Sequence, residues 1–127
     1  MGKFEDWQAK HRDVVREINP EGRKSPIMVA ISELAPEISE IIGITLLGGV
    51  CSRPQLEMKS RALCNVAALV VMGREPVLKE WILNALNSGC AKEEIVEVIA
   101  QMAFYSGIPS AVIGFNVAKQ AFDQHGC

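Results

Sequence analysis

Two residues of the irregular segment VCSRPQL, Arg53 and Cys51, have side chains suited to small-molecule chemistry. Arg53 precedes a proline in a predicted loop, so its guanidinium can reach into a cleft, where its planar fork suits a carboxylate or an enolate. The alternative is a salt bridge, in solvent or between subunits. Cys51 is either a thiol activated by the neighbouring cation or a small apolar residue that packs in the interior.

Trp81 and Tyr105 are two further candidates, on predicted helices closer to the C-terminus. Trp81 follows Leu78 by three residues and precedes Ala85 by four, so it lies on or beside the apolar face of its helix. It fills the core, or it forms the flat wall of a pocket; an indole cannot transfer a proton at neutral pH. Tyr105, in the turn YSGIP, carries a phenol that could donate a proton, and the alternative is structural packing.

The cysteine and histidine pattern gives no support for a metal site or a redox dithiol. Cys51, Cys64, Cys90 and Cys127 form no CxxC pair, and the two histidines lie near opposite ends of the chain. Cysteines without such a pattern are expected to be free thiols in the reducing cytosol, so we predict a cytoplasmic protein. Because no metal-ligand or redox spacing is present, we also predict no metal and no cofactor.

Composition narrows the possible partners. The 127 residues carry a net charge of −2 with scattered basic residues, which does not fit a nucleic-acid binder. The N-terminus has no signal-peptide pattern, and the apolar run 66–72 is far shorter than the roughly 18 residues of a membrane span. A mean hydropathy of +0.16 therefore predicts apolar surface covered by like chains, and Leu83, on an otherwise polar helix side, fits such a contact.

Helical spacing dominates the chain and no segment alternates with period two, which predicts an all-α fold. Gly48 and Gly49 are expected to end the third helix. The fourth is apolar nearly all round from Ala62 onward, so it should be the central buried helix, with Cys64 in the core. Ala91, before the sixth, has no side chain to act as an N-cap. The predicted helices cover residues 4–19, 27–34, 36–47, 56–72, 75–87, 92–105 and 110–124.

The order of these segments resembles the carboxymuconolactone decarboxylase family, within the alkylhydroperoxidase D-like group. The resemblance runs from about Gly49 to Phe122. Its motifs are GVCSRPQL (49–56), KSRAL (59–63), GREPVLKEWILNALNSG (73–89), KEEIVEVI (92–99) and YSGIPSA (105–111). It implies one compact domain over residues 1–127 of about six helices (N-terminal helices 4–47, family core 49–122), assembled into trimers or hexamers with small-molecule pockets near subunit contacts.

The resemblance also implies two chemistries, and this chain lacks key groups of both. The CxxCxxxH motif of the thiol peroxidases would fall on Arg74, Val77 and Trp81, so a peroxidase is not expected. The decarboxylases usually show a GEVWSR-like segment, where Arg53 is retained but Gly49 replaces a glutamate and Cys51 a tryptophan. Trp81 again occupies the position of the family's histidine.

These observations lead to an expected function. We predict a carboxymuconolactone decarboxylase-like lyase that acts on a small anionic ring or lactone compound by decarboxylation, isomerisation or cyclisation. Arg53 would bind the anion, Trp81 and Cys51 would form walls of the substrate site, and Tyr105 is the remaining candidate acid. The alternative is a non-catalytic oligomer of the same fold that binds a small molecule or a partner protein.

Overall fold

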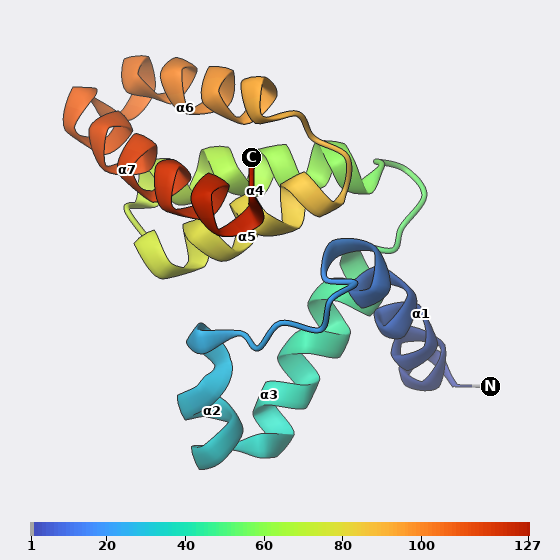
Figure 1. The fold of residues 1–127 in the computed structure, drawn as a ribbon. Helices are drawn as coiled ribbons and strands as arrows, with labels where there is room; N and C mark the ends of the chain where they lie inside the picture. Colours follow the sequence, from blue (N-terminus) through green and yellow to red (C-terminus); the bar gives the residue numbers. More distant parts are fainter. Residues whose placement is uncertain (1) are drawn as a thin grey trace. The chain divides into compact units, whose positions relative to one another are not determined.

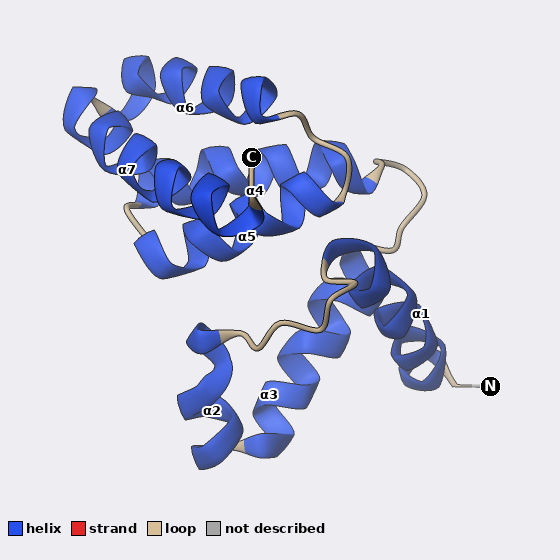
Figure 2. Cartoon of the chain, viewed as in Figure 1, coloured by secondary structure: helices blue, strands red, loops and turns tan. Residues whose placement is uncertain are grey.

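The computed structural model describes residues 2–127, which are helical and contain no strand (Figures 1 and 2). The prediction of an all-α fold is confirmed. The helices are α1 (Lys3–Ile18), the 3₁₀ turn η1 (Pro26–Met28), α2 (Val29–Leu34), α3 (Pro36–Gly43), the π-helix η2 (Ile44–Val50), α4 (Met58–Met72), α5 (Glu75–Asn87), α6 (Lys92–Ser106) and α7 (Ile108–His125).

The chain forms two compact units, Met1–Met58 and Lys59–Cys127. Unit 1 contains α1, α2, α3 and η2 and ends with the first residue of α4; unit 2 contains the rest of α4 and α5 to α7. Each unit is described by itself below. The predicted single domain over residues 1–127 is not tested by this division and stays a prediction.

In unit 1, the pair Gly48-Gly49 does not end a helix, contrary to the prediction. The chain passes from α3 directly into η2, and both glycines lie inside that π-helix. An added Cβ at Gly48 would lie 2.0 Å from the Trp7 carbonyl oxygen, and one at Gly49 would lie 2.9 Å from the Trp7 indole. The two glycines therefore let the backbone of η2 come close to α1. In a sequence, a Gly-Gly pair is consistent with such a close contact and equally with the end of a helix.

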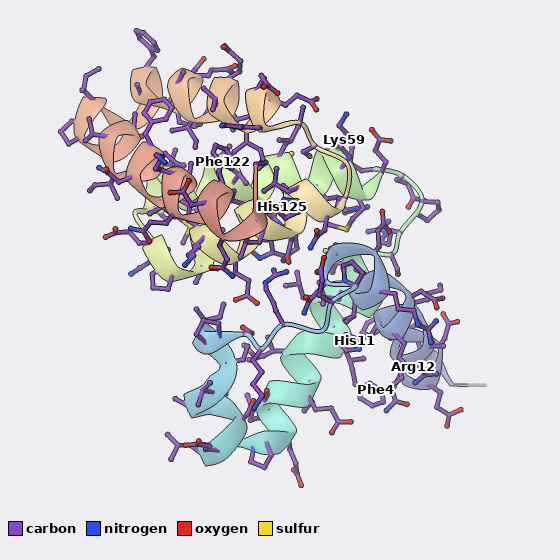
Figure 3. All side chains as sticks on the ribbon, viewed as in Figure 1. Phe4, His11, Arg12, Lys59, Phe122 and His125 are labelled. Atoms are coloured by element: carbon purple, nitrogen blue, oxygen red, sulfur yellow. The ribbon has the colours of Figure 1, made fainter. Side chains whose placement is uncertain are left out.

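α1 packs against η2 through Trp7 and the residues that follow it. Val14 and Ile18 are buried. His11 contacts Gly43 of α3, with its Nε2 3.4 Å from the position of an added Cβ, and Figure 3 shows its ring on α1. Burial and, secondarily, the Arg12 guanidinium hold the pKa of His11 below its ordinary value.

In unit 2, the most buried helix is α5, which has the predicted bounds Glu75–Asn87. Six of its residues are buried: Leu78, Trp81, Ile82, Leu83, Asn84 and Ala85. Leu83 is only 6% exposed because other residues of the same chain cover it. Its side chain therefore offers little accessible surface for the predicted subunit contact.

The prediction that α4 is the central buried helix, with Cys64 in the core, is wrong. Ala62, Val66 and Val70 are buried, one turn apart on a single face. Cys64 lies on the exposed side of the helix. Apolar residues all round a helix do not show which face the neighbouring helices will cover.

α6 begins at Lys92, and the cap that the Ala91 side chain cannot provide is partly supplied by Glu94. The Glu94 side chain accepts a hydrogen bond from the Ala91 N–H at 2.8 Å, which is the reverse half of a capping box. Lys59 forms an ion pair with the same carboxylate at 3.2 Å. The Ala91 hydrogen bond first, and then Lys59, lower the pKa of Glu94.

α6 and α7 are separated by one residue, Gly107, whose φ of +94° favours glycine. α7 thus starts at Ile108, two residues earlier than predicted. Gly114 of α7 lies against Ile99 of α6 and Val70 of α4, and an added Cβ would lie 3.0 Å and 3.3 Å from their methyl groups. Three of the four helices of unit 2, α4, α6 and α7, therefore meet at this glycine.

Across residues 2–127 the structure has no helix whose length and apolar character would let it cross a membrane.

We expect Gly48→Ala to lower the free energy of unfolding by about 2 kcal/mol or more, because the methyl group would displace the backbone of α1. Gly43→Ala is the matched control: its Cβ would lie 3.4 Å from the flexible His11 ring, and replacing a helical glycine favours folding by up to about 1 kcal/mol. Urea unfolding followed by circular dichroism measures both. Equal stability of the two variants would contradict the close-approach account.

We expect His11 to make unfolding pH-dependent. Its pKa is lowered in the folded chain, so the unfolded chain takes up the proton first as the pH falls below about 6.5. The melting temperature should therefore drop between pH 7.5 and 5.5, and His11→Gln should flatten that drop. An unchanged slope in His11→Gln would refute the assignment.

Candidate functional site

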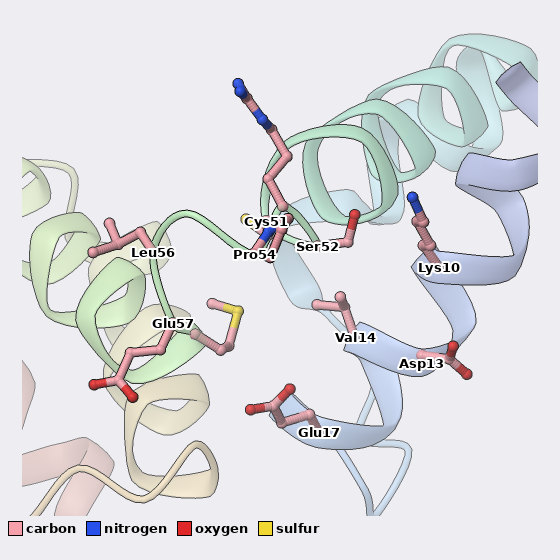
Figure 4. Close-up of a pocket in the computed structure, with 11 residues that line it drawn as sticks. Lys10, Asp13, Val14, Glu17, Cys51, Ser52, Pro54, Leu56 and Glu57 are labelled. Carbon is pink, nitrogen blue, oxygen red and sulfur yellow. The ribbon is translucent and has the colours of Figure 1, made fainter.

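Unit 1 contains an open pocket of about 320 Å³ between α1 and the segment that follows η2 (Figure 4). Both walls belong to unit 1. The lining residues are Lys10, Asp13, Val14, Glu17, Cys51, Ser52, Arg53, Pro54, Leu56, Glu57 and Met58.

One wall of the pocket is a single face of α1. Lys10, Asp13, Val14 and Glu17 recur at the spacing of consecutive helical turns, so their side chains point to the same side. Val14 is buried at the base of this face, and the other three are charged. Figure 4 shows Lys10, Asp13 and Glu17 following one another along the helix.

The other wall is the turn that leaves η2. The Cys51 N–H donates to the Leu46 carbonyl at 2.8 Å and the Arg53 N–H to the Val50 carbonyl at 3.2 Å. The Ser52 hydroxyl donates to the Gly48 carbonyl. These bonds tie the turn to the same π-helix that carries the two glycines, which places Arg53 and Cys51 opposite α1.

The structure brings together two of the predicted site residues, Arg53 and Cys51. Arg53 is exposed, as a residue that binds a soluble ligand must be, and Cys51 is 7% exposed. Trp81 and Tyr105 belong to unit 2. Trp81 is 7% exposed and packed in α5 beside Leu78 and Ile82, whereas Tyr105 is 76% exposed at the end of α6.

Four charged residues of this pocket were not predicted from the sequence: Lys10, Asp13, Glu17 and Glu57. Lys10 forms an ion pair with Asp6 at 3.0 Å, and Asp13 forms one with Arg16 at 3.3 Å. The helical spacing of the three residues on α1 was visible in the sequence. Whether that shared face lines a pocket depends on how α1 packs against η2, and the sequence alone does not show this packing.

The lining charges are mixed, with three carboxylates and two cations. Such a site can bind a carboxylate through Arg53 while placing other carboxylates around the remainder of the ligand. Among the described residues 2–127, no group of three or more His, Cys, Asp or Glu side chains is arranged to hold a metal ion.

The two positions at which family acid or base groups are expected hold structural contacts instead. Trp7 lies directly against Gly49, so a glutamate side chain at residue 49 would have to displace the indole. Trp81, at the position of the family's histidine, is itself buried. Neither position supplies a proton-transfer group.

Comparison with known proteins agrees with the motifs quoted above. The model of the carboxymuconolactone decarboxylase family matches residues 43–120. A 4-carboxymuconolactone decarboxylase of Acinetobacter baylyi is 33% identical over 79 residues, which are 62% of this chain and 59% of that protein. An uncharacterized 15.0 kDa protein of Paracoccus denitrificans is 28% identical over 121 residues, which are 94% of this chain and 90% of that protein.

The family match begins at the junction of α3 and η2 and runs to within a few residues of the end of α7. It includes the turn that carries Cys51 and Arg53, and it covers more than half of the chain. The protein therefore belongs to the carboxymuconolactone decarboxylase family.

Proposed function

We propose that this chain is a decarboxylase-like lyase that acts on a small anionic ring or lactone compound, with Arg53 as the anion-binding residue. The observation that carries the proposal is the place of Arg53: it lines a pocket, on the turn after η2, within the part of the chain that matches the family. The 33% identity to a 4-carboxymuconolactone decarboxylase supports the reaction class.

The proposed reaction uses the guanidinium to stabilise negative charge. In decarboxylation, the bond between the ring carbon and the carboxylate breaks, CO₂ leaves, and the electron pair passes into the lactone carbonyl as an enolate. A bidentate guanidinium binds that enolate more strongly than a neutral carbonyl, which lowers the barrier. Isomerisation or cyclisation through the same anion would use Arg53 in the same way.

The proton that replaces CO₂ needs another source, because an indole at residue 81 cannot supply it. The pocket is open, so water can reach the ring carbon and donate the proton. Catalysis would then depend on substrate positioning and electrostatics. Cys51 forms part of the wall beside Arg53. The roles predicted for Trp81 as a wall and for Tyr105 as an acid stay predictions.

We expect Arg53→Ala to lower kcat by about 10²-fold, the effect typical of losing one donor to a developing oxyanion. Arg53→Lys should restore part of the loss, since it keeps the charge without the planar fork. The assay is CO₂ release from 4-carboxymuconolactone and related lactone acids. Arg12→Ala, exposed on α1 and outside the pocket lining, is the control and should retain activity.

Two outcomes would contradict this proposal. Full activity of Arg53→Ala would remove the guanidinium from the mechanism. Lactone acids that raise the melting temperature of the wild-type chain but are recovered unchanged would favour the alternative, a non-catalytic small-molecule binder of the same fold.

We also propose that the chain is a homo-oligomer, a trimer or a hexamer. Large apolar side chains at two places support it: α3, and the α6–α7 corner of unit 2. Exposed apolar side chains that gather in one place often mark a protein–protein contact. The most exposed among them are Ile38, Ile41, Ile42, Phe104, Tyr105 and Ile108.

Light scattering should give a mass of three or six times 13.9 kDa. Phe104, which is 85% exposed, is the most direct position to test, and Phe104→Lys should lower the mass without loss of helical circular dichroism. Gln120→Lys, on the exposed side of α7, adds the same charge as a control. A monomeric mass for the wild-type chain would refute the proposal.

A further inference from the structure

We infer that Trp7 of α1 is a positioning residue for Arg53, so that a side chain outside the family match sets how well the pocket binds an anion. The inference rests on the proposed anion-binding role of Arg53 and adds a residue that acts through it. Trp7 is not among the residues that line the pocket. Its effect on a ligand therefore passes through η2 and the turn that follows η2.

The Trp7 indole covers the backbone of η2 at Gly49. The atoms nearest to an added Cβ at Gly49 are Cδ2, Cε3 and Cε2 of Trp7, at 2.9, 3.0 and 3.1 Å. Similar distances to three bonded ring atoms place this Cβ position over the face of the indole rather than at its edge. The ring therefore leaves room at residue 49 for a hydrogen atom only.

The residues on either side of Gly49 supply carbonyl groups that hold the turn. The Gly48 carbonyl accepts a hydrogen bond from the Ser52 hydroxyl. The Val50 carbonyl accepts one from the Arg53 N–H at 3.2 Å. Because both acceptors adjoin the residue that the indole covers, a shift of η2 at Gly49 would move the Arg53 backbone with it.

Two parts of Trp7 contact η2, and mutation can separate them. The carbonyl oxygen lies against Gly48, and every residue at position 7 would have this group. The indole lies against Gly49 and is removed in Trp7→Ala. That variant keeps the backbone approach of α1 to η2 and removes only the packing of the ring.

The family match includes the segment that is positioned and excludes the residue that positions it. The match covers residues 43–120, which include η2 and the turn with Arg53, whereas Trp7 lies before it. The anion-binding side chain thus comes from the family segment, and a contact from outside that segment fixes its backbone.

The test uses benzoate, a ring carboxylate, whose dissociation constant from the full chain is measured by ligand-observed NMR titration. Arg53→Ala should weaken binding by about fivefold, as for an exposed charge pair. Trp7→Ala should weaken it by about threefold with Arg53 present and leave it unchanged in the Arg53→Ala background, because the two residues act as one unit. Trp7→Phe keeps a flat ring on Gly49 and should restore most of the affinity.

A second readout follows the Arg53 backbone directly. Hydrogen exchange of the Arg53 N–H should be faster in Trp7→Ala than in Trp7→Phe, because the Val50 acceptor is held less firmly. Ile18→Ala is the matched control: Ile18 is buried on the same helix and outside the pocket lining. This variant should lower the melting temperature without weakening benzoate binding. Trp7→Leu, which keeps apolar volume without a ring, replaces Trp7→Ala if that variant does not fold.

The outcomes separate the inference from the proposed function. If the wild-type chain does not bind benzoate, or Arg53→Ala binds it equally well, the anion-binding role fails and the inference fails with it. If Arg53→Ala weakens binding but Trp7→Ala does not, only the positioning role is overturned. Equal weakening by Trp7→Ala in both backgrounds, or unchanged exchange of the Arg53 N–H, would also overturn the positioning role alone.

Discussion

Trp7 lies against two consecutive glycines of the π-helix η2, and the geometry of the pocket follows from that contact. A side chain at Gly48 would coincide with the Trp7 carbonyl group, so the backbones of α1 and η2 approach as closely as only glycine allows. The face of α1 that carries Lys10, Asp13 and Glu17 is thereby held opposite the turn with Cys51 and Arg53. π-helices are rare and often lie at functional sites, which agrees with this arrangement.

Aromatic packing occurs at the two positions where the resemblance to the family predicts an acid or a base. The residue where a glutamate is expected is Gly49, covered by Trp7. The residue where a histidine is expected is Trp81, buried in α5. Because neither indole can act as an acid or a base at neutral pH, the chemistry we propose depends on Arg53, a cation on the rim of an open pocket, and on water.

The charged residues of this pocket come from two segments, of which one lies inside the family match and the other outside it. Arg53 lies on the turn within the family match, and the acidic wall lies on α1, outside it. Under the proposed function, Arg53 stabilises the enolate from within the family match, whereas the charged residues of α1 face it from outside the match.

Local patterns in the sequence were sufficient for most of the helices and for the family. The spacing of Leu78, Ile82 and Ala85, with Gly89 beyond them, predicts α5 with its observed bounds, because one amphipathic helix is specified by nearby residues alone. Arg53 and Cys51 were predicted from the turn that carries them; both line the pocket of unit 1, and their roles stay predictions. Tertiary packing decided which side of α4 is covered, so that Cys64 is exposed and Leu83 is buried. It also decided that α1 and η2 come close together at Gly48 and that Glu17 lines the same pocket as Arg53. Both features depend on contacts between residues that are distant in the chain.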